Sequence, residues 1–351
     1  MTGRIPAYAA PAPKAPLVPF EITRRDPRSD DVRIEILYCG VCHSDIHQAR
    51  DEWSPGIFPM VPGHEIVGRV TKVGEKVTKL AAGDLAGVGC FVDSCLSCDP
   101  CRRDLEQFCE KGTAFTYNGT EMDRKTPTYG GYSTEIVVKE RFALKVPSGL
   151  DPASAAPLLC AGITTFSPLR TWGVKPGDRV AVVGLGGLGH MAVKLASAMG
   201  GDVTMLSTSQ AKEADARKLG AHAFELTNRP DALARLSGRF DLLIDSISVQ
   251  HDLNAYLGLL RPEGTMVLLG VPPAPAPVGA MSLIFGNRRL AGSMIGGIAE
   301  TQEMLDFCGA RNITADVEII PIGKINEAYE RMIRSDVRYR FVIDIATLSR
   351  D

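Results

Sequence analysis

The chain of 351 residues lacks several features that would place it in a special class of protein. No apolar run reaches the roughly 18 residues that span a bilayer. The N-terminal segment 1–19, rich in alanine and proline, has no charged start followed by an apolar stretch, so no secretory signal is expected. No internal repeat stands out, and biased composition is confined to 6–16 and 272–277. A cytoplasmic protein is therefore the default expectation.

The chain also lacks an excess of charge of either sign. Its formal net charge is −2, with 23% charged and 45% hydrophobic residues, which is ordinary globular composition. A near-neutral balance argues against a nucleic-acid binder held by a basic surface. The length exceeds what one typical core accommodates, so two domains are expected.

Cysteine, by contrast, is abundant, with nine residues. In a reducing cytosol so many cysteines are better explained by metal binding or catalysis than by disulfide bonds. An odd number would also leave one cysteine without a disulfide partner. Cys39, Cys90 and Cys308 have no ligand-like neighbours in the sequence. We expect these three to be ordinary buried thiols.

Four of the cysteines, Cys95, Cys98, Cys101 and Cys109, lie within fifteen residues. Four thiolates at this spacing suit a closed tetrahedral zinc site with no room for substrate. The rival is an iron–sulfur cluster, whose bacterial run begins with the same spacing but ends in C-x3-C-P. Here the last gap is seven residues and Glu110 follows. The pattern therefore favours a structural zinc that holds a loop with little apolar core of its own.

A second group of metal ligands is spread along the chain. The stretch 39–47 reads Cys-Gly-Val-Cys-His-Ser-Asp-Ile-His, and groups of these kinds are costly to bury without partners. Two cysteines and one histidine leave a tetrahedral corner open for water or substrate, and we expect that set to be Cys42, His64 and Cys160. Glu65 is expected to reach the metal from outside or to exchange with a ligand. Asp45 is expected to fix the tautomer of His64.

The periodicity changes near Asp151. Up to about Pro147 the pattern is strand-like and broken by glycines, with clear strands expected over 32–37 and 65–70. Beyond it one helix is expected over 152–169, with a bend at Pro157. About six strands then alternate with helices, which predicts a parallel sheet covered on both faces. The expected strands are 179–183, 203–206, 223–226, 242–244, 265–269 and 290–295; the expected helices begin near Leu188, Gln210 and Thr301, and a last strand is expected over 341–345.

The segment Gly184-Leu185-Gly186-Gly187-Leu188-Gly189 follows the first of these strands and opens a helix. In that context G-x-G-x-x-G indicates a dinucleotide site. Gly184 allows a tight turn, Gly186 lets the backbone approach a pyrophosphate, and Gly189 lets the helix pack closely on the sheet. The alternative is a plain turn between strand and helix.

The end of the second strand of this region carries no carboxylate. It reads Ser207-Thr208-Ser209, and Lys212 follows one helical turn later. Hydroxyls donate hydrogen bonds to a 2′-phosphate and an ammonium neutralises it, whereas an acidic residue here would grip an unphosphorylated ribose. We therefore expect NADP(H) rather than NAD(H).

Taken together, these motifs resemble the zinc-dependent medium-chain alcohol dehydrogenases and, within them, the cinnamyl alcohol dehydrogenase branch. The resemblance covers nearly the whole chain. The segments that carry it are 40–45, 62–65, the four cysteines, 128–132, 157–164, 184–189, 301–308 and 336–344. It implies an α/β architecture in which a GroES-like β-rich catalytic domain (1–153 and 297–351, with a zinc lobe at 91–112) accompanies a doubly wound Rossmann domain (154–296) with a six-stranded parallel sheet.

The resemblance also implies roles for residues that the motifs alone do not assign. Ser44 matches the hydroxyl of a proton relay, His47 its solvent-side base, and Arg338 or Arg340 is implied near the cofactor. His43 and Thr164 are also expected at the cofactor, with Thr164 near the nicotinamide. Side chains expected at the substrate pocket are Trp53, Phe58, Phe91, Phe285 and Ile295.

The main hypothesis is an NADP(H)-dependent alcohol dehydrogenase that works chiefly as an aldehyde reductase, with two zinc ions per chain. The family further implies a homodimer, while the balanced charge and the lack of a long apolar run lead us to expect no nucleic-acid or membrane partner. One alternative is an NAD(H)-dependent polyol or secondary-alcohol dehydrogenase of the same superfamily. The other is a zinc-stabilised binding module, against which the balanced charge of the four-cysteine lobe counts.

Overall fold

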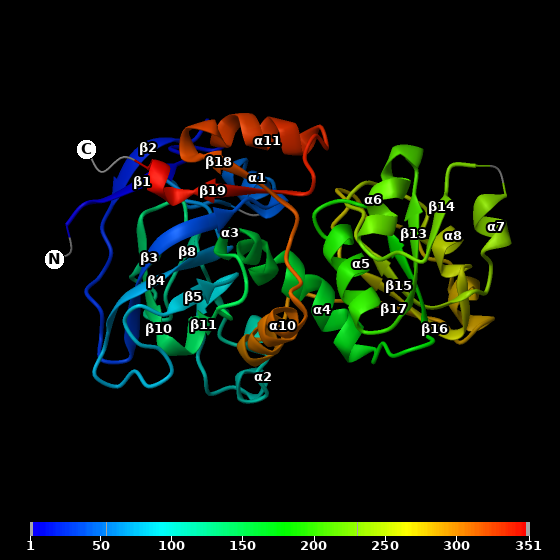
Figure 1. The fold of residues 1–351 in the computed structure, drawn as a ribbon, viewed down its shortest axis with the longest axis horizontal. Helices are drawn as coiled ribbons and strands as arrows, with labels where there is room; N and C mark the ends of the chain where they lie inside the picture. Colours follow the sequence, from blue (N-terminus) through cyan, green and yellow to red (C-terminus); the bar gives the residue numbers. More distant parts are fainter. Residues whose placement is uncertain (1–2, 54, 230, 349–351) are drawn as a thin grey trace. The chain divides into compact units, whose positions relative to one another are not determined.

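The computed structural model describes residues 3–53, 55–229 and 231–348, which fold as two units (Figure 1). The first, called here the two-part unit, comprises Met1–Cys160 and Gly296–Asp351. The second, called the inserted unit, comprises Ala161–Ile295. In the described part of the chain, no helix combines the length and the apolar character needed to cross a membrane.

The two-part unit is built on a seven-stranded sheet in the order β11-β5-β4-β3-β19-β18, with β10 also paired to β3. Its strands are β3 (Asp31–Gly40), β4 (Ile66–Val73), β5 (Leu85–Val88), β10 (Glu135–Lys139), β11 (Leu144–Lys145), β18 (Val317–Pro321) and β19 (Arg340–Asp344). Short pairs are made by β1 (Ile5–Ala9) with β2 (Val18–Ile22), β6 (Phe91–Asp93) with β7 (Ala114–Phe115), and β8 (Gly119–Thr120) with β9 (Pro127–Thr128). Its α-helices are α1 (His43–Ala49), α2 (Asp99–Arg102), α3 (Pro152–Ala155), α10 (Ile298–Arg311) and α11 (Ile325–Ile333).

The two ends of the chain meet in this sheet. Strand β19 runs antiparallel to β3, with Val342 opposite Gly40 and Ile343 opposite Cys39. Apolar side chains of β3 and β19 are buried together, among them Ile34 and Phe341, which are fully buried. This pairing brings the C-terminal strand next to the residues that lead into Cys42.

The inserted unit contains a six-stranded, all-parallel sheet in the order β14-β13-β12-β15-β16-β17. Its strands are β12 (Arg179–Val183), β13 (Asp202–Ser207), β14 (Ala223–Leu226), β15 (Phe240–Asp245), β16 (Leu260–Leu268) and β17 (Arg289–Gly292). Its helices are α4 (Ala161–Thr171), α5 (Gly189–Ala198), α6 (Glu213–Lys218), α7 (Ala232–Arg235), α8 (Leu253–Leu257) and α9 (Ala280–Ile284). The predicted six-stranded parallel sheet is thus confirmed.

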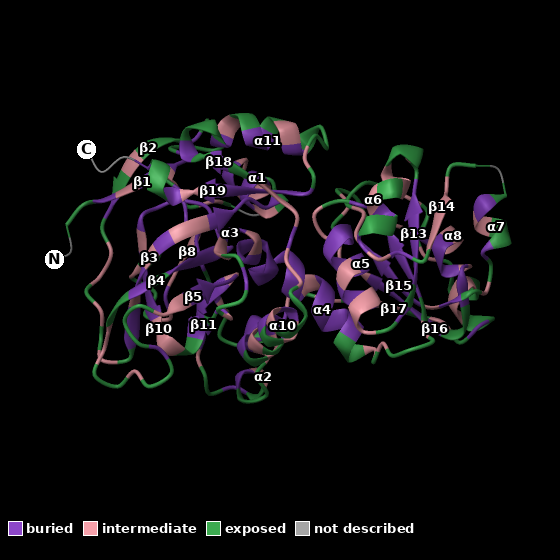
Figure 2. Ribbon diagram, in the orientation of Figure 1, coloured by how far each residue is buried: buried purple, intermediate pink, exposed green. Residues whose placement is uncertain are grey.

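The central strands of the inserted unit are apolar because both faces of the sheet are covered. Buried residues run along β12, β13 and β15 (Figure 2). Helix α5 packs against β12 and β13, α6 against β14, and α8 against β16. The strand order reverses between β12 and β15, and such a reversal is where ligands bind in doubly wound sheets.

The expected helix over 152–169 is wrong as one element. Helix α3 gives way to a 3-10 turn at Ala156–Leu159, and Cys160 has φ −129° and ψ −68°, outside the helical region, before α4 begins. Pro157 contributes to the break because it has no backbone N–H to donate. The break leaves the thiol of Cys160 on a non-helical residue between two helical segments.

Smaller differences concern where elements begin and end. The expected helix from Gln210 begins as a 3-10 turn, Gln210–Lys212, followed by α6. Strand β17 ends at Gly292, and Ile295 adopts a left-handed backbone with φ 45°. Helix α10 begins three residues before Thr301. Boundaries of this kind follow tertiary contacts more than local periodicity.

Candidate metal and nucleotide sites

The structure brings together the three residues expected to hold an open zinc site. One potential ligand atom from each of Cys42, His64, Cys160 and Glu65 lies within 4.8 Å of every other, and all four residues are buried. Cys42 caps the N-terminus of α1, His64 and Glu65 directly precede β4, and Cys160 lies at the break before α4. Three different segments thus converge on one point within the two-part unit.

The position of His64 depends on the glycine before it. Gly63 has φ +101°, a conformation that other residues rarely adopt. A Cβ atom there would lie 2.7 Å from the ring of Tyr132 and 2.8 Å from Sγ of Cys39. Glycine is therefore required for the chain to pass this point and turn the imidazole toward the two thiols.

Asp45 is fully buried and is hydrogen-bonded to the segments that carry Cys42 and His64. One carboxylate oxygen, Oδ1, lies 3.1 Å from Nδ1 of His64 and accepts a hydrogen bond of 3.1 Å from the backbone N–H of Gly63. The other, Oδ2, accepts from the backbone N–H of Cys42 at 2.9 Å and from the Tyr132 hydroxyl at 3.3 Å. Because a carboxylate only accepts, Nδ1 of His64 carries a proton, and Nε2 is the ring atom that would bind a metal.

The two thiols of this group already differ in their acidity. Their sulfur atoms lie 3.9 Å apart. The hydrogen bond between them lowers the pKa of Cys42 well below its usual value and raises that of Cys160. A thiolate, a second thiol and an imidazole form the kind of donor set that zinc prefers.

Glu65 and Arg340 form a buried ion pair beside these ligands. Burial raises the pKa of Glu65 to about 8. Its Oε1 is paired with Arg340, whereas the buried Oε2 has no hydrogen-bond partner among the described residues. An orphaned carboxylate oxygen next to two sulfurs and a nitrogen fits a metal that takes Glu65 as a fourth or exchanging ligand. Arg340, expected at the cofactor, is only 3% exposed and is held by this carboxylate.

Cys90 is not the ordinary buried thiol that we expected. Its side chain is hydrogen-bonded to that of Cys160, and this contact lowers the pKa of Cys90. The thiol is also 3.8 Å from the backbone carbonyl of Leu159. Nothing in the spacing of the cysteines marks Cys90, because 70 residues separate it from Cys160.

The residues expected to relay a proton follow Cys42 on helix α1. The Ser44 hydroxyl lies 3.6 Å from Sγ of Cys42. Nδ1 of His47 lies 2.6 Å from a carboxylate oxygen of Glu52, and its ring stacks on Trp53 with 4.7 Å between centroids. Glu52 was not anticipated from the sequence, although it lies only five residues beyond His47. His43, an exposed residue at the start of α1, has its ring centroid 6.5 Å from that of His47.

The side chains expected at the substrate pocket have different environments. Trp53 is 46% exposed beside His47, and Phe58 packs partly buried against the core of the two-part unit. Phe91 is only 4% exposed and packs edge-on against Phe142. In the inserted unit, Phe285 at the end of α9 is 80% exposed, and the backbone of Ile295 is left-handed.

The four clustered cysteines also converge. One sulfur from each of Cys95, Cys98, Cys101 and Cys109 lies within 4.8 Å of every other. Backbone N–H groups donate to two of these sulfurs, from Cys98 to Cys95 at 3.3 Å and from Cys95 to Cys109 at 3.4 Å. Hydrogen bonds from Ser97 are the main cause that lowers the pKa of Cys95 to about 5. The arrangement fits a closed four-sulfur site.

The glycine-rich turn of the inserted unit has the form that a dinucleotide site needs. Gly184 has φ +87°, and a Cβ on Gly189 would lie 1.8 Å from the carbonyl oxygen of Gly184. A Cβ on Gly186 would meet no atom within 4 Å, so the backbone there faces open space. Gly187 and Leu188 complete the turn into α5. The residues fit a pyrophosphate held at the start of this helix.

The loop after β13 lies beside this turn. Ser207 ends the strand, and its hydroxyl accepts from the backbone N–H of Ser209 at 3.2 Å. Lys212 reaches back to the turn, where its ammonium donates to the carbonyl oxygen of Leu185 at 2.8 Å. Thr164, also expected at the cofactor, lies half-buried on α4 of the same unit.

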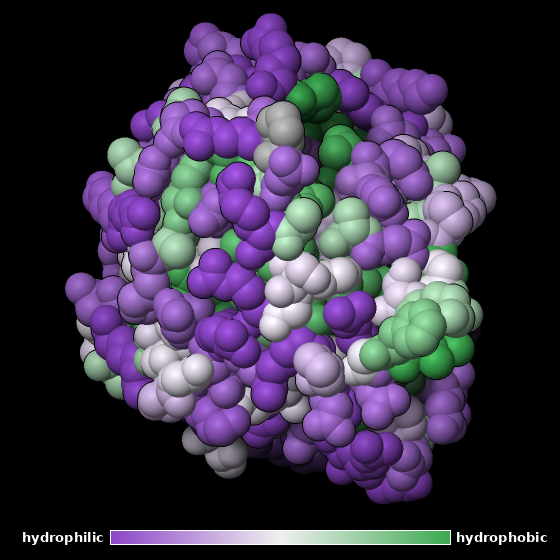
Figure 3. Space-filling model, turned by 90° about the vertical axis from the view of Figure 1, so that its right-hand side faces the viewer, coloured by the Kyte–Doolittle hydropathy of each residue, from purple (hydrophilic) through white to green (hydrophobic). Residues whose placement is uncertain are grey.

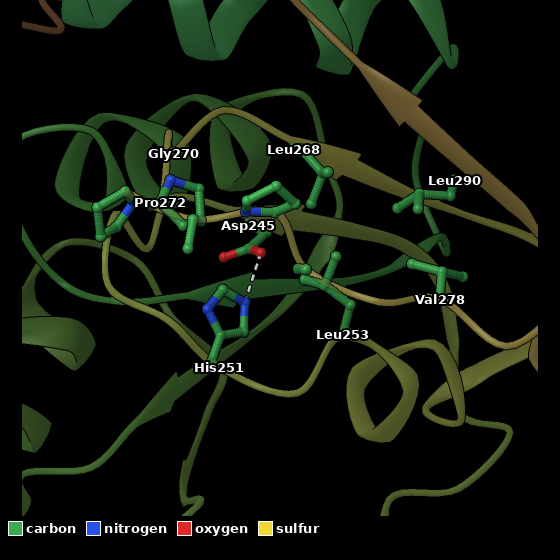
Figure 4. Close-up of a pocket in the computed structure, with 12 residues that line it drawn as sticks. Asp245, His251, Leu253, Leu268, Gly270, Pro272, Val278 and Leu290 are labelled. Atoms are coloured by element: carbon green, nitrogen blue, oxygen red, sulfur yellow. Dashed lines mark hydrogen bonds and ion pairs between the residues drawn. The ribbon is translucent and has the colours of Figure 1, made fainter. Parts of the chain in front are cut away.

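A cavity of about 440 Å³ at the ends of β15 and β16 was not anticipated (Figure 4). Within it, Nε2 of His251 lies 2.8 Å from a carboxylate oxygen of Asp245, and burial raises the pKa of Asp245. The rest of the lining is mainly apolar, with Leu253, Leu268, Leu290 and the proline-rich segment 272–278. The His251–Asp245 pair spans six residues that show no motif in the sequence.

Comparison with known proteins gives two family matches and close relatives. The family described as "Alcohol dehydrogenase GroES-like domain" matches residues 28–148, and "Zinc-binding dehydrogenase" matches residues 187–310. The NADP-dependent alcohol dehydrogenase C 1 of Mycolicibacterium smegmatis is 54% identical over 98% of this chain and 99% of its own. Aldehyde reductase YahK of Escherichia coli is 52% identical over 99% of each chain. Among solved structures, a cinnamyl alcohol dehydrogenase of Sorghum bicolor (SbCAD4) superposes with a TM-score of 0.96 at 42% identity, over 99% of each chain.

Proposed function

The chain belongs to the zinc-dependent medium-chain alcohol dehydrogenases, in the branch that resembles cinnamyl alcohol dehydrogenases, and from this premise we propose its reaction. It transfers hydride between NADP(H) and a primary alcohol or aldehyde and acts chiefly as an aldehyde reductase. The observation that carries the proposal is the convergence of Cys42, His64 and Cys160 within 4.8 Å in a buried site.

The donor set accounts for the chemistry. A zinc ion bound by two sulfurs and one nitrogen would polarise the substrate oxygen, while NADP(H) would supply or accept the hydride. Asp45 orients His64 so that Nε2 would bind the metal, because its carboxylate accepts a hydrogen bond from Nδ1–H. Ser44, whose hydroxyl lies 3.6 Å from Sγ of Cys42, would hold the proton nearest the metal ligands. His47, half exposed and oriented by Glu52, would pass it to solvent.

The preference for NADP(H) is supported by the loop after β13. It contains Ser207, Thr208 and Ser209 with Lys212 beyond them, and no carboxylate that would repel a 2′-phosphate. The relative of M. smegmatis is named as NADP-dependent. We propose the same preference here, and a higher kcat/KM with NADH than with NADPH would refute it.

The substrate class is tested by initial rates. A panel of aromatic and medium-length aliphatic aldehydes, with the matching alcohols and a polyol, would be assayed with each cofactor. We expect aldehyde reduction with NADPH to give the highest kcat/KM, and metal analysis to give two zinc ions per chain. A polyol oxidised best with NAD would instead support the alternative dehydrogenase.

We further propose that the chain works as a homodimer formed through the inserted unit. Apolar side chains gather in places on the mostly hydrophilic face in Figure 3. In this unit Met281, Ile284 and Phe285 on or next to α9 are 56%, 65% and 80% exposed. Strand β17 ends the sheet, and its side away from β16 pairs with no other described strand. Exposed apolar side chains and a free strand edge are features of association surfaces. Sedimentation of wild type and an Ile284→Lys variant is expected to give a dimer and a monomer, respectively; a monomeric wild type would refute this.

The cytoplasm is the compartment we propose for this dimer. All nine cysteines are free in the structure, and thiols that bind metals persist best where disulfides are kept reduced.

A further inference from the structure

The loops that follow strands β13 and β14 are joined side by side. The two strands pair in parallel, with Ser207 opposite Leu226, so their carboxyl ends lie at the same edge of the sheet. The backbone N–H of Thr227 donates to the carbonyl of Ser207 at 2.9 Å. The side-chain amide of Asn228 donates to the carbonyl of Thr208 at 2.9 Å. These two hydrogen bonds hold the loop after β14 (the second loop) alongside the loop after β13 (the first loop).

Arg229 continues this series. Its Nη2 donates to the side-chain oxygen of Gln210 at 3.2 Å, and Gln210 lies between Ser209 and Lys212 in the first loop. The side chain of Arg229 is exposed, and among the described residues no carboxylate is ion-paired with it. Glu213, the first residue of α6, accepts instead from the side-chain amide of Gln210 and is ion-paired with Arg217. Most N–H donors of the guanidinium are thus available beside the first loop, which contains Ser207, Thr208 and Ser209.

Lys212 alone is a weak match for a phosphate monoester. Such a group carries close to two negative charges at neutral pH, whereas Lys212 carries one positive charge. Its ammonium also donates to the carbonyl of Leu185, which leaves fewer of its three donors for another partner. A second cation on this edge of the sheet would balance the charge, and a guanidinium can bind two phosphate oxygens at once.

We propose that Arg229 is a specificity-determining residue for the cofactor, which binds the 2′-phosphate of NADP(H) together with Lys212 and the hydroxyls of Ser207 to Ser209. The second loop would thus supply the second positive charge of the phosphate site, which the first loop lacks. This inference rests on the proposed preference for NADP(H). Arg229 lies outside both the glycine-rich turn and the first loop, on the loop after β14.

The test measures binding of nucleotide fragments, which requires neither hydride transfer nor the zinc site. Titration calorimetry would compare adenosine 2′,5′-bisphosphate with 5′-AMP for the zinc-loaded wild type and for Arg229→Gln. Removal of a charge-assisted interaction is expected to weaken binding of the bisphosphate about tenfold or more. Binding of 5′-AMP is expected to stay within about twofold, since that ligand has no 2′-phosphate.

Two further variants separate the possible outcomes. Arg179→Gln removes an exposed arginine from the start of β12. This residue lies at the amino ends of the parallel strands, whereas both loops lie at their carboxyl ends, so the variant is expected to bind both ligands like wild type. Lys212→Gln is expected to weaken binding of the bisphosphate selectively. If Arg229→Gln bound the bisphosphate as tightly as wild type, or lost 5′-AMP equally, the inference would be wrong while the NADP(H) preference stood. If wild type bound the bisphosphate no more tightly than 5′-AMP, the preference itself would fail.

Discussion

The carboxylate of Asp45 gives the sharpest test of how this site is built. Four of its partners are hydrogen-bond donors: the backbone N–H groups of Cys42 and Gly63, Nδ1 of His64 and the hydroxyl of Tyr132. In an Asp45→Asn variant, one oxygen is replaced by an amide that itself donates. Two of the four buried donors then face another donor, whichever way the amide is turned.

The magnitude depends on which pair of donors loses its acceptor. If the amide replaces Oδ2, Tyr132 can rotate its hydroxyl to accept, and only the N–H of Cys42 is left unsatisfied, at a cost of about 1–3 kcal/mol in stability. If the amide replaces Oδ1, it favours the His64 tautomer with the proton on Nε2, which blocks the ligand atom. Loss of such a supporting partner typically lowers metal affinity about 10- to 100-fold.

The assay is competition for zinc with a chelator, with the zinc content counted per chain. We expect Asp45→Asn to release one zinc ion at a chelator concentration that leaves two in wild type. Asp31→Asn is a matched control, because Asp31 is equally buried but ion-paired with Arg25. It is expected to lose stability and keep both ions. Retention of both ions with unchanged affinity, together with unchanged stability, in Asp45→Asn would refute the reasoning.

Three further changes test other parts of the site. Cys98→Ser is expected to leave one zinc ion per chain and to make the 91–112 lobe sensitive to protease; two tightly bound ions would contradict the closed four-sulfur site. Glu65→Leu leaves the buried Arg340 without its ion-pair partner and is expected to lower the free energy of unfolding in urea by about 3–5 kcal/mol. The double variant Glu65→Leu/Arg340→Leu is expected to lower it less, and an equal decrease in both variants would argue against the ion pair. Ser44→Ala is expected to slow turnover about 100-fold with both zinc ions retained, and unchanged rates across the pH range would exclude the relay through Ser44 and His47.

Much of the fold was predictable because its signals are local. Alternating apolar strands and helices around Gly184 indicate a parallel sheet, and the six-stranded order confirms it. The four-cysteine spacing similarly lies within one short segment, 95–109. The helix expected over 152–169 failed because periodicity does not register the break at Cys160, where the backbone leaves the helical region.

The rest of the site depends on contacts that no local pattern encodes. Glu65 and Arg340 meet only because β19 returns to pair with β3, which places residues 275 positions apart in one ion pair. Cys90 gains its neighbour Cys160 in the same way, through the packing of distant segments. The resemblance alone places Trp53 at a substrate pocket, and no pattern in the sequence indicates that its ring stacks on His47. Side-chain direction of this kind is fixed by packing, which the sequence alone does not reveal.

The central claim is an open zinc site formed by Cys42, His64 and Cys160. Its most direct test is an anomalous difference map, recorded at the zinc absorption edge from crystals of the zinc-loaded protein. We expect two peaks per chain, one among the four clustered cysteines and one within bonding distance of Sγ of Cys42, Sγ of Cys160 and Nε2 of His64. A map with a peak only at the four clustered cysteines would contradict the account.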